Sequence, residues 1–241
     1  MRNAIFVIAR RELNSFFDSL MAYILLALFL GFTGFFTWVL GGGDVFFIGQ
    51  ATLSQFFSYA NLSFFIFIPA LTMQLLAEEK KIGTLELLLT KSVTDRQVVF
   101  GKFLAAVTML AIALLFTLPF VVTIFSIGNA DIGQIISGYF GLLLTGAAFV
   151  SIGLYASSLT SNQIVSFLIA LIISVFFQFI FGLIASSMPG VIGEVFEQLS
   201  VNTHFDSISR GVIDTRDLIY FISVIFLGLF LSEFSLTKRN Q

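Results

Sequence analysis

Charged side chains are scarce in this sequence. They make up 11% of its 241 residues, whereas hydrophobic residues make up 58%, and the mean hydropathy is +1.02. A water-soluble domain carries about 25% charged residues to cover its surface. So much apolar surface must face lipid rather than water. The sequence therefore predicts an integral membrane protein of the all-α class, which uses nearly all of its length for spans.

Residues and motifs that support chemistry are also missing. Cysteine is absent, which excludes disulfides and thiolate metal sites, and the net charge of −2 gives no sign of a nucleic-acid partner. The Gly-x-x-x-x-Gly-Lys-Ser/Thr pattern that cradles nucleotide phosphates is absent, as are His-Glu-x-x-His and Gly-x-Ser-x-Gly. The single histidine, His204, is far in sequence from any plausible partner, so a structural role is favoured over a catalytic one. We expect no catalytic residue, no metal and no cofactor bound by this chain.

Six apolar stretches are long enough to cross a bilayer. A hydrocarbon core of about 30 Å requires about 20 helical residues. The expected spans form one transmembrane domain over residues 1–241 and cover residues 20–40, 56–77, 98–127, 136–157, 164–186 and 218–236. The third stretch is longer than a span needs, so it is expected to tilt or to emerge from the membrane as a helix.

The distribution of Lys and Arg predicts the orientation of these spans. Ten of the twelve basic residues lie before the first span, between the end of the second span and the first residues of the third, or after the last one. The other side has only Arg210 and Arg216, both in the 187–217 loop. Cytoplasmic loops are enriched in Lys and Arg. Both termini and the 78–97 segment are therefore expected in the cytoplasm, and the 187–217 loop outside it.

Residues 1–18 have the pattern of an amphipathic helix lying along the membrane surface. Polar and apolar side chains lie on opposite faces at helical spacing. The apolar face comprises Ile5, Ile8, Ala9, Leu13, Phe16 and Phe17, and the polar face comprises Arg10, Arg11, Asn14 and Asp18. The alternative is an ordinary basic anchor before a span.

The centres of the expected spans carry no Asp, Glu, Lys, Arg or His, and Glu233 lies near a span end. Ion-coupled transporters usually place ionisable groups at that depth. The energy for any transport is therefore expected to come from elsewhere. Gln178, near the middle of the fifth span, is expected to hydrogen-bond to a neighbouring helix, and a contact with a transported substrate is the alternative.

The stretch from Glu78 to Lys102 concentrates nine charged side chains in this apolar chain. Gly83 is expected to end the second helix, and Thr84 to Thr90 can form a short helix with Leu85, Leu88 and Leu89 on one face and Glu86 on another. Thr94-Asp95-Arg96-Gln97 fits a capping box, so the third helix is expected to begin at Asp95. Such order favours an element that docks on a cytoplasmic partner. The alternative is a plain positive-inside loop.

The segment AEEKKIGTLELLLTKSVTDRQVVFGKFLAA resembles the cytoplasmic loop of ABC-2 type transporter permeases, in particular those associated with gliding motility. It is also similar to that of the nitrous-oxide reductase maturation permease. The resemblance extends to RRELNSFF, from Arg10 to Phe17, and to SVNTHFDSISRGVIDTRDLIYF, from Ser200 to Phe221. The chain departs from its relatives at Lys91-Ser92, where they commonly have Ser-Pro. The loop match is carried by Glu79, Gly83, Thr84, Glu86, Leu88, Leu89, Thr90, Val93, Gly101 and Lys102.

This resemblance implies the membrane half of an ATP-driven exporter in the bacterial cytoplasmic (inner) membrane. It implies six spans, an N-terminal interfacial helix, a coupling helix within residues 78–97 and short extracytoplasmic helices within residues 187–217. The implied partners are a separate ABC subunit that binds ATP and Mg, a second permease copy in a homodimer or heterodimer, and an auxiliary membrane-anchored extracytoplasmic subunit. The implied docking residues are Glu79, Gly83, Thr84, Leu85, Glu86, Leu88, Leu89, Thr90, Thr94 and Asp95. The alternative is an ATP-independent scaffold or channel-like component of an envelope machine.

Overall fold

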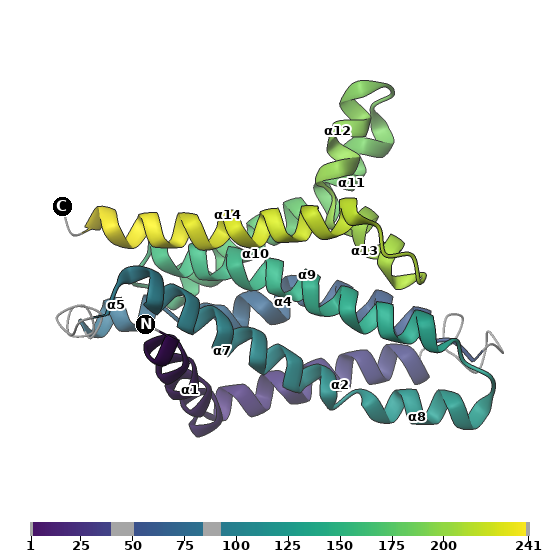
Figure 1. The fold of residues 1–241 in the computed structure, drawn as a ribbon, viewed down its shortest axis with the longest axis horizontal. Coiled ribbons are helices and arrows are strands. Elements are labelled where there is room, and N and C mark those ends of the chain that lie inside the picture. Colours follow the sequence, from purple (N-terminus) through teal and green to yellow (C-terminus); the bar gives the residue numbers. More distant parts are fainter. Residues whose placement is uncertain (1, 40–50, 84–92, 240–241) are drawn as a thin grey trace.

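The chain folds into an elongated bundle of helices in a computed structural model that describes residues 2–39, 51–83 and 93–239 (Figure 1). These ranges contain no strand. The fold is therefore all-α, as predicted. The helices are α1 (Arg2–Asp18), α2 (Leu20–Trp38), α4 (Ser54–Thr72), α5 (Ala77–Ile82), α7 (Asp95–Leu115), α8 (Leu118–Ile127), α9 (Ile132–Leu159), α10 (Gln163–Val175), the π-helix η1 (Phe176–Ile180), α11 (Phe181–Ser187), α12 (Val191–Leu199), α13 (Val201–Ser209) and α14 (Thr215–Arg239).

Among the described residues, six helical segments are long and apolar enough to cross a membrane, which agrees with the predicted number of spans. They are Leu20–Trp38, Ser54–Ile82, Asp95–Ile127, Ile132–Leu159, Gln163–Ser187 and Thr215–Lys238. Several begin before the apolar stretch does, because a polar residue caps the helix earlier. The fourth starts at Ile132, where the Asp131 carboxylate accepts hydrogen bonds from the Gly133 and Gln134 amides at 2.8 and 3.3 Å.

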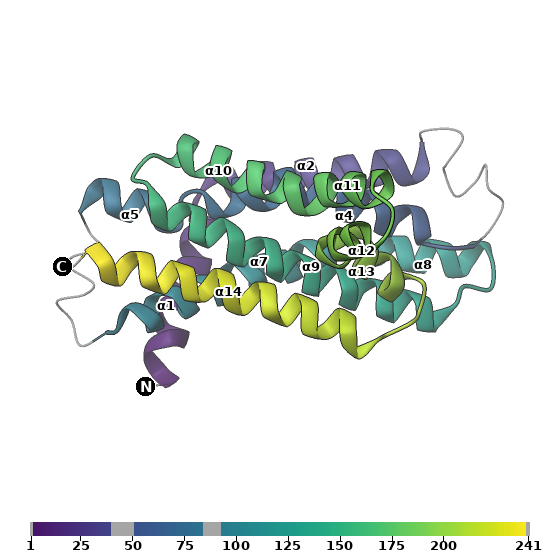
Figure 2. The ribbon, with the colours of Figure 1, turned by 90° about the horizontal axis from the view of Figure 1, so that it is seen from above.

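Helix α9 forms the centre of the bundle (Figures 1 and 2). Its glycines allow neighbouring helices to approach closely. A Cβ atom on Gly146 would lie 2.1 Å from Leu110 Cδ2 of α7, and one on Gly153 would lie 2.0 Å from Thr72 Oγ1 of α4. Small residues are favoured where membrane helices touch, because close packing replaces the hydrophobic driving force that lipid removes. The helices packed against α9 are α4, α5, α7, α10, α13 and α14.

Two of the spans are interrupted near a proline. The third is divided into α7 and α8 by a turn at Phe116 and Thr117, directly ahead of Pro119, whose ring cannot follow an uninterrupted helix. The second span contains Pro69. Its first helix, α4, ends at Thr72, and the span resumes as α5. Interruptions at membrane depth require substitute hydrogen-bond partners, because lipid supplies none.

Ser157 of α9 supplies those partners at the break between α4 and α5. Its hydroxyl accepts hydrogen bonds from the amides of Leu76 and Ala77, both at 3.0 Å, and donates one to the Met73 carbonyl at 3.1 Å. One side chain therefore satisfies three backbone groups, and α5 is held against α9.

The start of α1, the end of α14 and all of α5 lie at one end of the bundle, which we call the termini end (Figure 1). Near the opposite end, α12 projects across the long axis of the bundle and exposes the apolar residues Val191, Ile192 and Val195 (Figure 1). Helix α13 instead packs into the bundle, with Val201, Phe205 and Ile208 buried. The 187–217 loop thus contains two short helices, and one of them belongs to the core.

Candidate functional site

Helix α1 packs against α7 at the termini end. Ile8, Ala9 and Phe16 are buried, while Arg10 is exposed, as the amphipathic pattern predicted. Phe17 is partly buried and also packs against the core. The two helices approach closely at Gly101, where a Cβ atom would lie 2.7 Å from Ile8 Cγ2. This contact fixes the polar residues of α1 next to α5 and α7.

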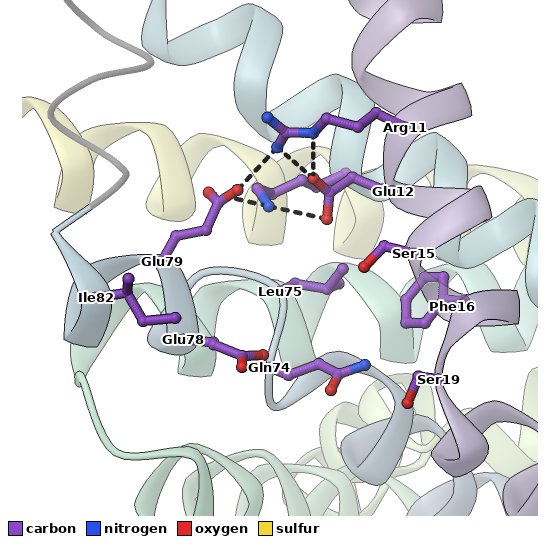
Figure 3. A pocket seen from close by; sticks show the side chains of 11 residues that line it. Arg11, Glu12, Ser15, Phe16, Ser19, Gln74, Leu75, Glu78, Glu79 and Ile82 are labelled. Carbon is purple, nitrogen blue, oxygen red and sulfur yellow. Dashed lines mark hydrogen bonds and ion pairs between the residues drawn. The ribbon is translucent and has the colours of Figure 1, made fainter.

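Four charged side chains from α1, α5 and α7 form a closed ring of ion pairs, which we call the ion-pair ring: Arg11, Glu12, Glu79 and Lys102 (Figure 3). Arg11 Nη2 lies 2.5 Å from Glu12 Oε1 and 2.8 Å from Glu79 Oε1. Lys102 Nζ lies 3.1 Å from Glu12 Oε2 and 3.0 Å from Glu79 Oε2. Cations and carboxylates alternate around the ring, so each charge has two opposite neighbours.

The burial of these side chains increases the energetic cost of breaking their ion pairs. The Lys102 side chain is 0% exposed, and the carboxylates of Glu12 and Glu79 are 13% and 16% exposed. Desolvating charges is expensive, and removing one partner of a buried pair leaves an uncompensated charge that costs about 3–5 kcal/mol. The ring is therefore expected to behave as one unit that holds three helices together.

Arg11 is the half-exposed member of the ring. Burial by itself would lower the pKa of Arg11, but its hydrogen bonds and ion pairs with Glu12 and Glu79 outweigh this effect and raise the pKa above its ordinary value. The guanidinium therefore stays charged at any physiological pH. It closes the ring on the solvent side, whereas Lys102 closes it on the buried side.

A cavity of about 430 Å³ lies beside the ring, between α1 and the break that precedes α5 (Figure 3). Its lining is mostly polar, which suits water or a charged group rather than lipid. The lining residues are Arg11, Glu12, Ser15, Phe16, Ser19, Gln74, Leu75, Glu78, Glu79, Ile82 and Lys102.

The ring stands next to the start of the predicted coupling segment. Gly83 ends α5 with a φ of 78°, a left-handed conformation that glycine adopts without steric cost, as expected from the sequence. Lys80 of α5 donates a hydrogen bond to the Ser158 carbonyl of α9. Six predicted docking residues lie outside the described residues: Thr84, Leu85, Glu86, Leu88, Leu89 and Thr90.

The other end of that segment is also tied to the bundle. The capping box at the start of α7 is present, because the Gln97 amide donates to Thr94 Oγ1 at 3.4 Å and the Thr94 amide donates to Gln97 Oε1 at 3.1 Å. Asp95 Oδ2 accepts a hydrogen bond from the Thr237 hydroxyl of α14 at 3.2 Å. Thr94 thus caps α7, and Asp95 connects the beginning of α7 to the last helix.

Sequence reasoning missed Glu12 as a functional candidate and gave Lys102 no structural role. One signal was available. Lys102 lies seven residues, or roughly 10 Å, beyond the start of α7, in a stretch from Val98 to Val107 that is otherwise apolar. A cation in such a place requires a carboxylate partner. The sequence could not indicate which carboxylate, because Glu12 and Glu79 lie on other helices.

Gln178 hydrogen-bonds to a neighbouring helix, as predicted, but that helix is α13 rather than another span. Gln178 Nε2 donates to Asn202 Oδ1 at 2.7 Å, and Asn202 Nδ2 donates to the Gln178 carbonyl at 2.7 Å. Asn61 of α4 donates to the same Asn202 oxygen at 3.0 Å. Three helices therefore meet at one asparagine.

His204 does have a partner, which corrects the expectation that none was near. Its Nδ1 lies 2.7 Å from Asp217 Oδ1, its Nε2 lies 2.9 Å from the Gln198 carbonyl, and its ring stacks on Tyr220 with 4.0 Å between centroids. The expectation failed because the turn after α13 brings Asp217 back alongside that helix. Both ring nitrogens are engaged, so the contacts agree with a structural role for His204.

A family model described as "ABC-2 family transporter protein" matches residues 8–211. This range includes every member of the ion-pair ring and extends through α13. No curated protein matches the chain significantly.

Proposed function

The chain belongs to the ABC-2 family of transporter proteins, and we propose that it is the permease subunit of an ATP-driven pump. Members of this family normally work in the membrane with an ATP-binding subunit. In this proposal a separate cytoplasmic subunit binds ATP and Mg, and two permease copies complete the transporter. The termini end faces the cytoplasm, as the distribution of Lys and Arg indicates.

One observation carries the proposal: both ends of the segment between Gly83 and Val93 are tied to several helices. At its start, Glu79 and Lys80 join α5 to α1, α7 and α9. At its finish, Asp95 joins α7 to α14. A loop that only connected two spans would require no such anchors. A displacement of this segment would be transmitted directly to α1, α7, α9 and α14, because its two ends are attached to those helices.

The work of this subunit is therefore conformational. Binding or hydrolysis of ATP in the partner would shift the 78–97 segment, and the ion-pair ring would pass that shift to α1 and to the span that begins with α7. A packed element with two discrete arrangements can transmit such a shift, whereas a loose loop absorbs it. The resemblance to gliding-motility permeases favours export of a cargo or transmission of force across the bacterial inner membrane.

Co-purification with the ATP-binding subunit tests this proposal. The chain carries an affinity tag and is co-expressed with a candidate ATPase, and the retained partner is quantified. Glu86→Arg and Leu88→Asp should abolish retention, because they reverse a charge and place a charge on the apolar face of the predicted docking helix. Retention of the partner by both variants, or purification of the wild-type chain alone, would refute the proposal.

Matched substitutions at the opposite end of the bundle provide the control. Glu194→Arg and Val212→Asp make the same kinds of change at exposed positions of the 187–217 loop. Both should retain the partner as well as the wild type does. If the control variants also lose the partner, the defect lies in membrane insertion or folding. The loss of the partner by Glu86→Arg and Leu88→Asp would then not support docking at those residues.

A further inference from the structure

Two cavities adjoin on the side of the bundle where α4 lies between α2 and η1. One has a volume of about 260 Å³, and six of the eight residues that line it carry a polar group. The other has a volume of about 570 Å³ and is lined almost entirely by Phe, Leu and Ile. Leu62 and Phe179 belong to the walls of both. The two cavities are therefore neighbours that share a wall, and we call the pair, with its polar and its apolar end, the amphipathic cleft.

The polar end is organised by Asn202, whose orientation is fixed. Its Nδ2 donates to the main-chain carbonyl of Gln178, which can only accept. Its Oδ1 must therefore face Asn61 and Gln178 and accept from their amide nitrogens at 3.0 and 2.7 Å. Both acceptor positions of that oxygen are used. The side-chain nitrogens of Asn61 and Gln178 thus both point at Asn202 Oδ1, and their own amide oxygens are left for other partners.

This arrangement leaves two acceptor oxygens unused at the cleft. Asn61 Oδ1 and Gln178 Oε1 have no hydrogen-bond partner among the described residues, although the residues are only 4% and 2% exposed. Buried polar atoms in folded proteins are nearly always paired, so two unpaired acceptors on one wall indicate a ligand that donates. The π-helix that carries Gln178 supports this view, since such segments occur frequently at functional sites.

Asp206 of α13 adds a third acceptor to the same wall. Burial raises the pKa of Asp206, and the charge of nearby Arg210 opposes that shift. A half-buried carboxylate of this kind is stabilised by a cationic donor, which compensates its lost hydration. The Ser58 hydroxyl already donates to the Ser54 carbonyl at 3.0 Å, so it does not supply that donor. The polar end of the cleft is thus rich in acceptors.

The apolar end extends from this point toward the middle of the bundle. The start of α4 and the end of α2 lie on the same side of the bundle. Asn61 lies seven residues, about 10 Å, from the start of α4. Leu25, at the apolar end, lies deeper, thirteen residues or about 20 Å from the end of α2. Phe29, Phe32 and Phe36 line the space between. A molecule in the cleft would therefore place its polar group nearer the membrane surface and its apolar part deeper, as a lipid in that leaflet does.

We propose that the amphipathic cleft binds one lipid whose ammonium headgroup donates hydrogen bonds to Asn61, Gln178 and Asp206. The hydrocarbon chain of the lipid lies along the Phe-lined part between α2 and α4. The proposal concerns a bound lipid, and it holds whether or not the chain is coupled to an ATPase.

Two lipids with the same chains and net charge but different donor capacity test the headgroup. Dioleoyl phosphatidylethanolamine and dioleoyl phosphatidylcholine have the same chains and the same net charge, but the quaternary choline nitrogen has no N–H. Native mass spectrometry of the full chain in detergent, titrated with each lipid, measures binding. We expect one tight site per chain with a roughly tenfold preference for the ethanolamine lipid, the ratio expected for about one charge-assisted hydrogen bond. Equal binding of the two lipids would overturn the proposal.

Variants then locate the site. Asn61→Ala and Asp206→Asn should each reduce the preference to about threefold or less, because the first removes an acceptor and the second removes the negative charge that the ammonium group pairs with. Ile66→Trp should prevent binding of both lipids by filling the apolar end, and Ile136→Trp, at a more exposed span residue on α9 that does not line the cleft, should bind as the wild type does. Melting temperatures confirm that each variant is folded. A preference that survives both polar variants would overturn the proposal. A different result would also overturn it: Ile66→Trp could abolish a species with two chains and leave lipid binding unchanged. The cleft would then be the contact site of a second copy of the chain.

Discussion

A double-mutant cycle on Glu79 and Lys102 tests whether the ion-pair ring is a coupled unit. Glu79→Gln leaves Lys102, which has no exposed surface, with Glu12 as its single carboxylate. Lys102→Met replaces the buried cation with an apolar side chain of similar length and leaves two carboxylates to share Arg11. The double variant retains only Arg11 and Glu12, whose charges balance. Each single change thus unbalances the ring, and the double change restores its neutrality.

The expected magnitude follows from the burial of the four side chains. Removing one partner of a fully buried pair costs about 3–5 kcal/mol. Glu79 is 16% exposed and each charge keeps one remaining partner, so we expect about 2 kcal/mol for each single variant. The double variant leaves no unpaired charge and should also lose about 2 kcal/mol, rather than the roughly 4 kcal/mol that additive effects would give.

Thermal unfolding in detergent, followed by the fluorescence of the single tryptophan, provides the assay. Trp38 packs on Phe120 with 5.7 Å between ring centroids, and neither residue belongs to the ring. At about 3 °C per kcal/mol for a chain of this length, all three variants should melt about 6 °C below the wild type. A double variant that melts about 12 °C lower would show additive effects and refute the coupling.

A second cycle, on Arg11 and Glu79, is the matched control. Arg11 is 48% exposed, so its coupling to Glu79 should be about 1 kcal/mol or less and should weaken in high salt. The coupling between Glu79 and Lys102 should persist at about 1 M salt, because ions do not screen a buried pair effectively. Equal salt sensitivity of the two couplings would contradict the burial argument.

Three further changes test other parts of the structure. Gly153→Ala should destabilise the bundle by about 1–3 kcal/mol, because its Cβ atom would lie 2.0 Å from Thr72 Oγ1, whereas Gly31→Ala has open space and should not lower the melting temperature. Thr94→Ala should cost about 1 kcal/mol and speed hydrogen exchange of the first α7 amides, and Thr94→Ser should restore both; unchanged exchange in Thr94→Ala would contradict the capping role. Burial raises the pKa of Asp206 in the folded chain. The protonated carboxyl therefore favours folding below the ordinary pKa of 3.8, and this contribution to stability is lost as the pH rises through the raised pKa of the folded chain. Asp206→Asn should therefore melt higher than the wild type at about pH 7, and this difference should vanish well below pH 3.8; a difference independent of pH would contradict the burial effect.

Much of the local structure follows from short-range patterns in the sequence. The six spans follow from the length of the apolar stretches, because lipid forces each one to satisfy its backbone hydrogen bonds as a helix. The capping box at Thr94 and the helix end at Gly83 depend on residues within three or four positions, so they too could be predicted. The amphipathic face of α1 required only its own periodicity.

Contacts between helices could not be predicted in this way. Lys102 forms an ion pair with Glu12, which lies ninety residues earlier, and Asn61 donates a hydrogen bond to Asn202, which lies 141 residues later. Periodicity identifies the face of a helix that packs, but it does not identify the partner, because every apolar face in a membrane can pack against lipid or against any other span. Helix α13 looked like part of a surface loop for the same reason, although it is buried against α9.

The sequence by itself therefore determined the class, the number of spans and the polar segment between Glu78 and Lys102. Only the tertiary structure decided that Lys102 is neutralised by carboxylates of α1 and α5, and that an asparagine of α13 orients two amides of the spans. The physical reason is that helix formation in lipid is a local requirement, met residue by residue along the chain. The pairing of buried charges and amides instead depends on which helices become neighbours, and that is settled by the packing of the whole bundle around α9.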